Sequence, residues 1–96
     1  MVTNIHSDAR IELRHSTLYY ESFNPGLSAR FRESIKASIA LAIESPLRFP
    51  RIEDNVRRVL VPVFPYAALY SIEENGINIL AVMHCARKPG YWKNRR

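Results

Sequence analysis

Residues 56–84 read VRRVLVPVFPYAALYSIEENGINILAVMH, and this stretch decides the fold. It holds three runs rich in strand-forming residues. The third run is apolar on both alternating faces, with Leu80 and Val82 on one face and, on the other, Ile77, Ile79, Ala81 and Met83. A strand that is apolar on both faces is typical of the interior of a sheet. We therefore expect this run to lie in the interior of the sheet.

Turn signals separate the three runs. Pro65 has no N–H to donate to a neighbouring strand and pushes Phe64 into an extended conformation, so the first run ends there. Asn75-Gly76 suits the two-residue type I′ turn, which requires positive φ angles and joins antiparallel strands with matching twist. The stretch predicts a three-stranded antiparallel meander.

The chain before this stretch predicts a short edge strand and two helices. Val2 and Ile5 fit a brief strand at the start. Ser7-Asp8 predicts the beginning of a helix, with the Ser7 hydroxyl as its cap and an acid in its first turn. This helix runs to about Glu21, because the residues at helical spacing along it form one face: Ala9, Leu13, Ser16, Thr17 and Tyr20.

Asn24-Pro25-Gly26 ends the first helix, and a second helix follows from Leu27 until Pro46. Residues 46–55 are expected to form a surface loop, with Phe49 filling the edge of the core. The predicted fold class is α+β with two layers: an N-terminal helical hairpin packed on a small twisted antiparallel sheet, in the order β-α-α-β-β-β. With 96 residues the chain is expected to form a single domain, 1–96.

The positive charge is concentrated at the C-terminus. Residues 1–74 carry nine basic and nine acidic side chains, whereas residues 75–96 carry five basic and no acidic ones. We define residues 87–96 as the tail, and its cations are Arg87, Lys88, Lys93, Arg95 and Arg96. A cationic tail attracts nucleic acid or an acidic protein segment. Its Tyr91 and Trp92 are typical of a contact surface, or of a segment that folds back on the sheet.

Several classes of protein are excluded. The single cysteine, Cys85, rules out an internal disulfide framework and a four-thiolate metal site. The sequence shows no metal-ligand spacing and no phosphate-binding loop, and no apolar run approaches the about 20 residues of a membrane span. We expect a cytoplasmic protein without cofactor or metal.

His84 is the one candidate for acid–base chemistry. It ends the third run near Arg87, and Arg57 and Arg58 lie on a strand close by. A histidine among arginines is a candidate for RNA cleavage at a 2′-hydroxyl, with the arginines stabilising the phosphate. Arg57 and Arg58 are adjacent in a strand and point to opposite faces, so at most one joins His84 and the other is expected to pair with a carboxylate. The alternative is that His84 makes a hydrogen bond at a strand end.

The order of these segments resembles the ParE branch of the RelE/ParE toxin superfamily. The matching segments are Ala9, Glu12-Leu13, Tyr19-Tyr20-Glu21, Pro25-Gly26-Leu27, Phe31, Val56–Val61, Phe64-Pro65-Tyr66, Tyr70, Ile79–His84, Arg87, Pro89 and Trp92. The resemblance covers nearly the whole chain. It implies the toxin of a type II toxin–antitoxin pair, also called a plasmid stabilisation protein, bound in a hetero-oligomer by an antitoxin whose acidic C-terminal segment folds along the toxin.

The resemblance leaves the cellular target open. ParE-like members poison DNA gyrase without catalytic residues of their own, while RelE-like members cleave mRNA in the ribosome. A ribosomal ribonuclease needs cations on the central strands to hold phosphate, and residues 59–84 contain no Lys or Arg, so the gyrase-directed, non-enzymatic function is favoured. In a ribonuclease the catalytic set is His84, Arg57 and Arg87. An inert member that only binds antitoxin is the third possibility.

The resemblance also implies a contact surface. For the gyrase-directed function we expect the target or the antitoxin to contact Arg58 and, in the tail, Arg87, Lys88, Tyr91, Trp92, Lys93, Arg95 and Arg96. We expect deletion of residues 87–96 to abolish toxicity while leaving the fold intact.

Overall fold

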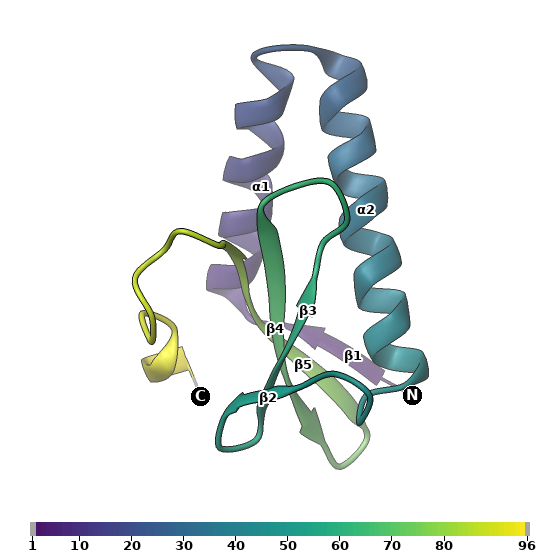
Figure 1. The fold of residues 1–96 in the computed structure, drawn as a ribbon, viewed down its shortest axis with the longest axis vertical. Coiled ribbons are helices and arrows are strands. Elements are labelled where there is room, and N and C mark those ends of the chain that lie inside the picture. The colour runs from purple at the N-terminus through teal and green to yellow at the C-terminus, as the bar shows by residue number, and fades with distance from the viewer. Residues whose placement is uncertain (1, 96) are drawn as a thin grey trace.

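The computed structural model describes residues 2–95 and shows a helical hairpin on one side of a sheet (Figure 1). Its elements follow the order β-α-α-β-β-β-β, with a short 3₁₀ helix in the tail. Their bounds are β1 Val2–Ile5, α1 Ser7–Glu21, α2 Pro25–Glu44, β2 Arg51–Glu53, β3 Val56–Leu60, β4 Tyr66–Glu73, β5 Gly76–His84 and η1 Lys93–Arg95. The predicted α+β class and the helical hairpin are confirmed.

The sheet has five strands in the order β1-β5-β4-β3-β2. The meander β3-β4-β5 is antiparallel throughout, as predicted. Two features differ from the prediction. β1 joins β5 in a parallel pairing, which makes the sheet mixed, and β2 lies within the predicted loop and pairs with β3. A three-residue strand at a sheet edge leaves too short a pattern to distinguish it from loop by sequence.

The two helices begin with different caps. His6 caps α1, because its Nδ1 accepts a hydrogen bond from the Asp8 amide at 3.1 Å, so the predicted cap at Ser7 was wrong by one residue. Asn24 caps α2 by accepting from the Gly26 amide at 2.7 Å, with Pro25 in the first turn, where its missing N–H costs nothing. Both caps lie at the breaks that the sequence marks.

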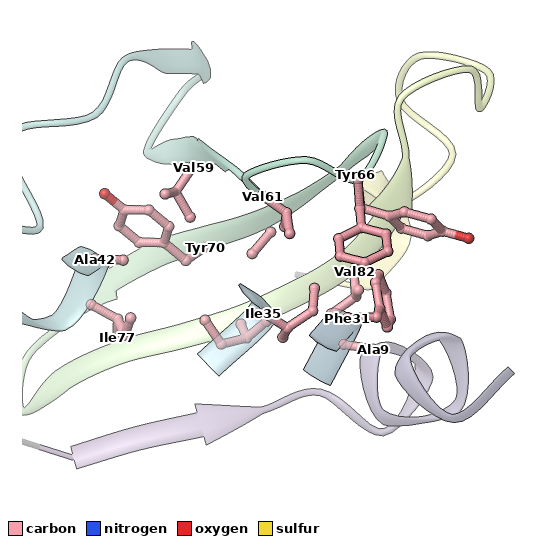
Figure 2. Packing of buried hydrophobic residues seen from close by; sticks show 13 residues of the cluster. Ala9, Phe31, Ile35, Ala42, Val59, Val61, Tyr66, Tyr70, Ile77 and Val82 are labelled. Atoms are coloured by element: carbon pink, nitrogen blue, oxygen red, sulfur yellow. The ribbon is translucent and has the colours of Figure 1, made fainter. Parts of the chain in front are cut away.

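The main core lies between the helices and the sheet (Figure 2). Phe31 and Ile35 of α2 and Tyr70 of β4 are almost fully buried in it. α1 packs against β5, and α2 packs against β3 and β4. Phe49 packs against the edge of this core, as predicted.

A β-bulge in β5 changes which side chains share a face. Opposite β4, Leu69 pairs with Ala81 and Tyr70 pairs with Ile79, so Leu80 is an extra residue. Leu80 and Ala81 therefore both face away from the helices, where they pack with Leu69. The predicted alternation holds as far as Leu80 and was wrong from Ala81 onward, because one inserted residue reverses the faces of every residue that follows it.

The β4-β5 hairpin turns one residue earlier than predicted. Glu73 pairs with Gly76, so Glu74 and Asn75 form the turn and Gly76 begins β5. Neither turn residue has a positive φ, which excludes the type I′ turn. The hairpin itself is confirmed.

Candidate functional site

The tail covers the face of the sheet that the helices leave open. Trp92 is only 3% exposed and packs with Val56, Leu69, Leu80 and Ala81 in a second, smaller core. Burying an aromatic ring of this size contributes substantially to folding. Trp92 therefore folds back onto the sheet, as one of the two alternatives predicted, and its burial argues against the prediction that deletion of the tail leaves the fold intact.

Glu12 holds the end of the tail from α1. Its carboxylate accepts hydrogen bonds from the Tyr91 hydroxyl at 2.5 Å and from both terminal nitrogens of Arg95, at 2.7 and 3.2 Å. Arg95 Nε also lies 3.6 Å from Asp8 Oδ2. The side chains of Arg95 and Glu12 are only 11% and 14% exposed, so this ion pair is shielded from solvent.

The same pair closes an open edge of β5. β1 pairs with β5 only as far as Ile79. Beyond that point the Leu80 carbonyl accepts from Arg95 Nη1 at 3.1 Å, and the Val82 amide donates to Glu12 Oε1 at 3.1 Å. The guanidinium and the carboxylate take the places that the backbone groups of another strand would fill, and so they satisfy backbone groups of the open edge.

Tyr91 stays protonated in this arrangement. Burial, followed by the hydrogen bond to Glu12, raises the pKa of the Tyr91 hydroxyl above its ordinary value of 10. The guanidinium carbons of Arg87 and Arg95 lie over its ring, at 4.0 and 5.0 Å from the centroid. Tyr91 thereby holds the Arg87 guanidinium in place over its ring.

Sequence reasoning did not single out Glu12, although a signal was present. Ala9, Glu12 and Ser16 are spaced three and four apart and share the face of α1 that packs on β5. A carboxylate on the buried face of a helix requires a basic or donor partner. That requirement predicts a partner for Glu12, and the structure identifies Arg95 and Tyr91.

The expected contact residues divide into two groups. Tyr91, Trp92 and Arg95 are engaged inside the protein and present little surface. The side chains that remain exposed are Arg58, Arg87, Lys88 and Lys93. Arg96 lies outside the described residues. The cationic surface available to a partner is therefore smaller than the sequence indicates.

A groove of about 410 Å³ lies between the tail and the outer face of the sheet. Its cationic side chains are Arg58, Arg87 and Lys93, and its apolar floor includes Leu69 and Trp92. The full lining is Ile52, Glu53, Arg58, Leu69, Met83, Cys85, Arg87, Pro89, Gly90, Trp92 and Lys93. We call this the tail groove.

The three candidates for RNA cleavage have different surroundings. His84 lines a hollow on the helix side with Tyr19, Phe23 and other residues, and its ring lies 5.1 Å from that of Tyr66. Its Nδ1 accepts from the Ala86 amide at 3.0 Å. Its predicted hydrogen bond at the strand end is therefore present.

Arg57 and Arg87 lie elsewhere. Arg57 Nη1 donates to the Phe49 carbonyl at 2.6 Å and to the Leu47 carbonyl at 3.3 Å. Arg57 pairs with Tyr70 of β4, whereas His84 pairs with Tyr66. Tyr66 and Tyr70 are four residues apart in β4, so the positions of His84 and Arg57 are separated by about 13 Å along the strand direction.

Arg87 faces the tail groove, on the other side of the sheet from the His84 hollow. Arg58 also lines the tail groove, so Arg57 and Arg58 point to opposite faces as predicted. Among residues 2–95 neither forms an ion pair, so the predicted partnership of one with a carboxylate was wrong.

Neither metal-binding nor membrane-spanning features were found in the part of the chain that the structure describes. Residues 2–95 hold no group of three or more His, Cys, Asp and Glu side chains that could bind a metal ion. No helix in the same range has the length and apolar character needed to cross a membrane.

Comparison with protein families agrees with the fold. Residues 4–89 match the family described as ParE toxin of the type II toxin–antitoxin system, parDE. The chain belongs to this family, and its partner is an antitoxin. A comparison with curated proteins found no match. Tyr91, Trp92 and Arg95 lie beyond the matched residues.

Proposed function

We propose that this toxin inhibits DNA gyrase and so blocks DNA replication, without catalysing a reaction of its own. The family supplies the toxin function and the antitoxin partner. The choice of target rests on the distribution of the candidate catalytic side chains.

The proposal rests on the positions of three side chains, His84, Arg87 and Arg57. His84 lies on the helix side of the sheet, and Arg87 lies in the tail groove on the opposite face. The guanidinium of Arg57 is bound to loop carbonyls. General acid–base cleavage requires the acid or base and the phosphate-stabilising cations to surround one reacting phosphate. The arrangement supports a protein that acts by binding.

The cation-free centre of the sheet supports the same choice. Residues 59–84 span β4 and β5 and contain no Lys or Arg. A protein that holds an mRNA backbone places several cations along its binding surface, since Lys and Arg neutralise the phosphate charge. On the outer face of the sheet, the exposed cations that line the tail groove are Arg58, Arg87 and Lys93, and all three lie outside residues 59–84.

The second candidate function is a ribosome-dependent mRNA endoribonuclease of the RelE type. One observation favours it: His84 is exposed, and its hollow is lined by exposed aromatic side chains, Tyr19 and Phe23. Such rings could stack on RNA bases. An inert member of the family that only binds antitoxin is the third candidate.

Pulse-labelling of DNA and protein synthesis after induction without the antitoxin tests the proposal. For a gyrase inhibitor we expect DNA synthesis to fall first, with filamentous cells and a DNA-damage response. Prompt loss of protein synthesis would instead identify an endoribonuclease. Normal growth at equal expression of the folded toxin would identify an inert member.

Purified gyrase supplies the direct test. The toxin should inhibit supercoiling of relaxed plasmid, and addition of its antitoxin should restore the activity. Full supercoiling in the presence of excess folded toxin would reject gyrase as the target.

A further inference from the structure

We propose that the tail groove binds a segment of the antitoxin in which a carboxylate side chain stands next to an apolar one. This inference rests on the antitoxin partnership of the family and not on the choice of gyrase as the target. It assigns the anionic group to Arg58 and Arg87 and the apolar group to the floor of the groove.

The two arginines are available for a carboxylate. No ion pair among residues 2–95 engages either of them. The nearby acid, Glu53, is held by Lys93 at 3.1 Å, which joins β2 to the tail at the groove. Guanidinium groups bind carboxylates through two parallel hydrogen bonds, which makes an arginine pair a selective site for an acidic residue.

Arg87 is also positioned in advance. Its guanidinium carbon lies 4.0 Å from the centroid of the Tyr91 ring, and the Tyr91 hydroxyl is itself fixed by Glu12. A side chain that is already stacked loses less conformational entropy on binding than a free one. The network around Glu12 thus contributes to the groove without touching the ligand.

The floor of the groove suits an apolar side chain. The apolar surface available to a ligand comes from Ile52 of β2, which is 39% exposed, and from the half-buried Met83, whereas Leu69 and Trp92 are buried and support the floor from below. The volume lies in the range of about 300–1,000 Å³ that is common for ligand pockets. Cations beside an apolar floor are complementary to an acidic residue with an apolar neighbour.

The same features disfavour nucleic acid as the occupant. Single-stranded nucleic acid binds where cations alternate with exposed aromatic rings on which bases stack. In the tail groove the aromatic ring is Trp92, which is 3% exposed and covered by its own packing. The groove therefore matches a peptide segment.

Cys85 gives a direct readout, because it lines the groove and is the only cysteine of the chain. The toxin is co-expressed with the antitoxin encoded beside it, and the intact complex is compared with free toxin in alkylation by iodoacetamide. We expect alkylation in the complex to slow by about tenfold or more, as for a thiol covered by a partner. An unchanged rate overturns the proposal.

Substitutions test the role of the arginines. Arg58→Ala and Arg87→Ala should each raise the dissociation constant for the antitoxin about tenfold or more, since each removes one charged partner. Lys36→Ala removes an equal charge from the exposed side of α2 and should leave the constant within about twofold. An unchanged constant in the Arg58→Ala variant overturns the proposal.

The test of the tail groove and the test of the gyrase proposal can fail independently of each other. Loss of toxicity with full antitoxin affinity in these variants would assign the groove to the cellular target and overturn the inference. The gyrase proposal itself fails on a different result, the order in which DNA and protein synthesis stop.

Discussion

Arg95 and Glu12, 83 residues apart in the sequence, form a bidentate ion pair that fastens the last turn of the chain to the first helix. The pair also occupies the open edge of β5, through the Leu80 carbonyl and the Val82 amide. One carboxylate thus serves an ion pair, a tyrosine hydroxyl and a strand edge. Its removal leaves the Tyr91 hydroxyl and the Val82 amide without this acceptor, and Arg95 with only the Leu80 carbonyl and the more distant Asp8.

Glu12→Ala should therefore lower the free energy of unfolding by about 2 to 4 kcal/mol, because Arg95 keeps its charge in a shielded site. Urea denaturation followed by circular dichroism measures the loss. Glu33→Ala, which removes an exposed carboxylate from α2, is the matched control and should stay within about 0.5 kcal/mol of the wild type. Equal losses in the two variants would show that the Glu12 network does not stabilise the fold.

Trp92→Ala should destabilise the protein by about 3 to 5 kcal/mol, because it empties the second core under the tail. Truncation before Arg87 should cost at least as much, since it also leaves Glu12 unpaired. Thermal unfolding followed by circular dichroism is the measurement. A truncated protein that unfolds at the wild-type temperature would mean that the tail is a separable appendage.

Local signals in the sequence predicted most of the fold. Asn24-Pro25-Gly26 and Pro46 bound the second helix within two residues, and Pro65 marks the start of β4 within one. These signals act through the backbone of the residues that carry them, so they remain valid whatever packs against them.

Sequence analysis missed the features that depend on contacts between residues distant in the sequence. The bulge at Leu80 depends on how β5 pairs with β4, and the same residues read as a regular alternation when taken alone. The role of the tail depends on Glu12, which is 79 and 83 residues away from its two partners. Charge counting identified a cationic tail, but it could not separate Arg95, which is used internally, from Arg87 and Lys88.

The stability of the protein should fall as the pH rises above 10, in part because of Tyr91. The folded state raises the pKa of this hydroxyl above its ordinary value of 10, through burial and through the hydrogen bond to Glu12. Below pH 10 the contribution is fully present, and it is lost as the pH rises towards the pKa of the folded state, where the unfolded chain binds fewer protons.

A Tyr91→Phe variant tests this pH dependence, because it removes the titrating hydroxyl and keeps the ring under Arg87. The free energy of unfolding, measured by urea denaturation between pH 8 and 11, should fall less steeply with pH in the variant than in the wild type. Identical slopes would show that Tyr91 does not contribute. Tyr20 and Tyr70, whose pKa values burial also raises, contribute to the slope that the variant retains.

His84→Ala should remain folded and toxic if the protein acts by binding gyrase. The imidazole contacts the Tyr66 ring and accepts one backbone hydrogen bond at an exposed strand end, so its loss should cost about 1 kcal/mol or less. Growth inhibition at matched expression should then stay within about twofold of the wild type, since the folded fraction hardly changes. His15→Ala, at an exposed position of α1, is the matched control. Loss of toxicity in a folded His84→Ala protein, with His15→Ala still toxic, would favour the endoribonuclease, because an acid–base catalyst contributes about a hundredfold or more to rate.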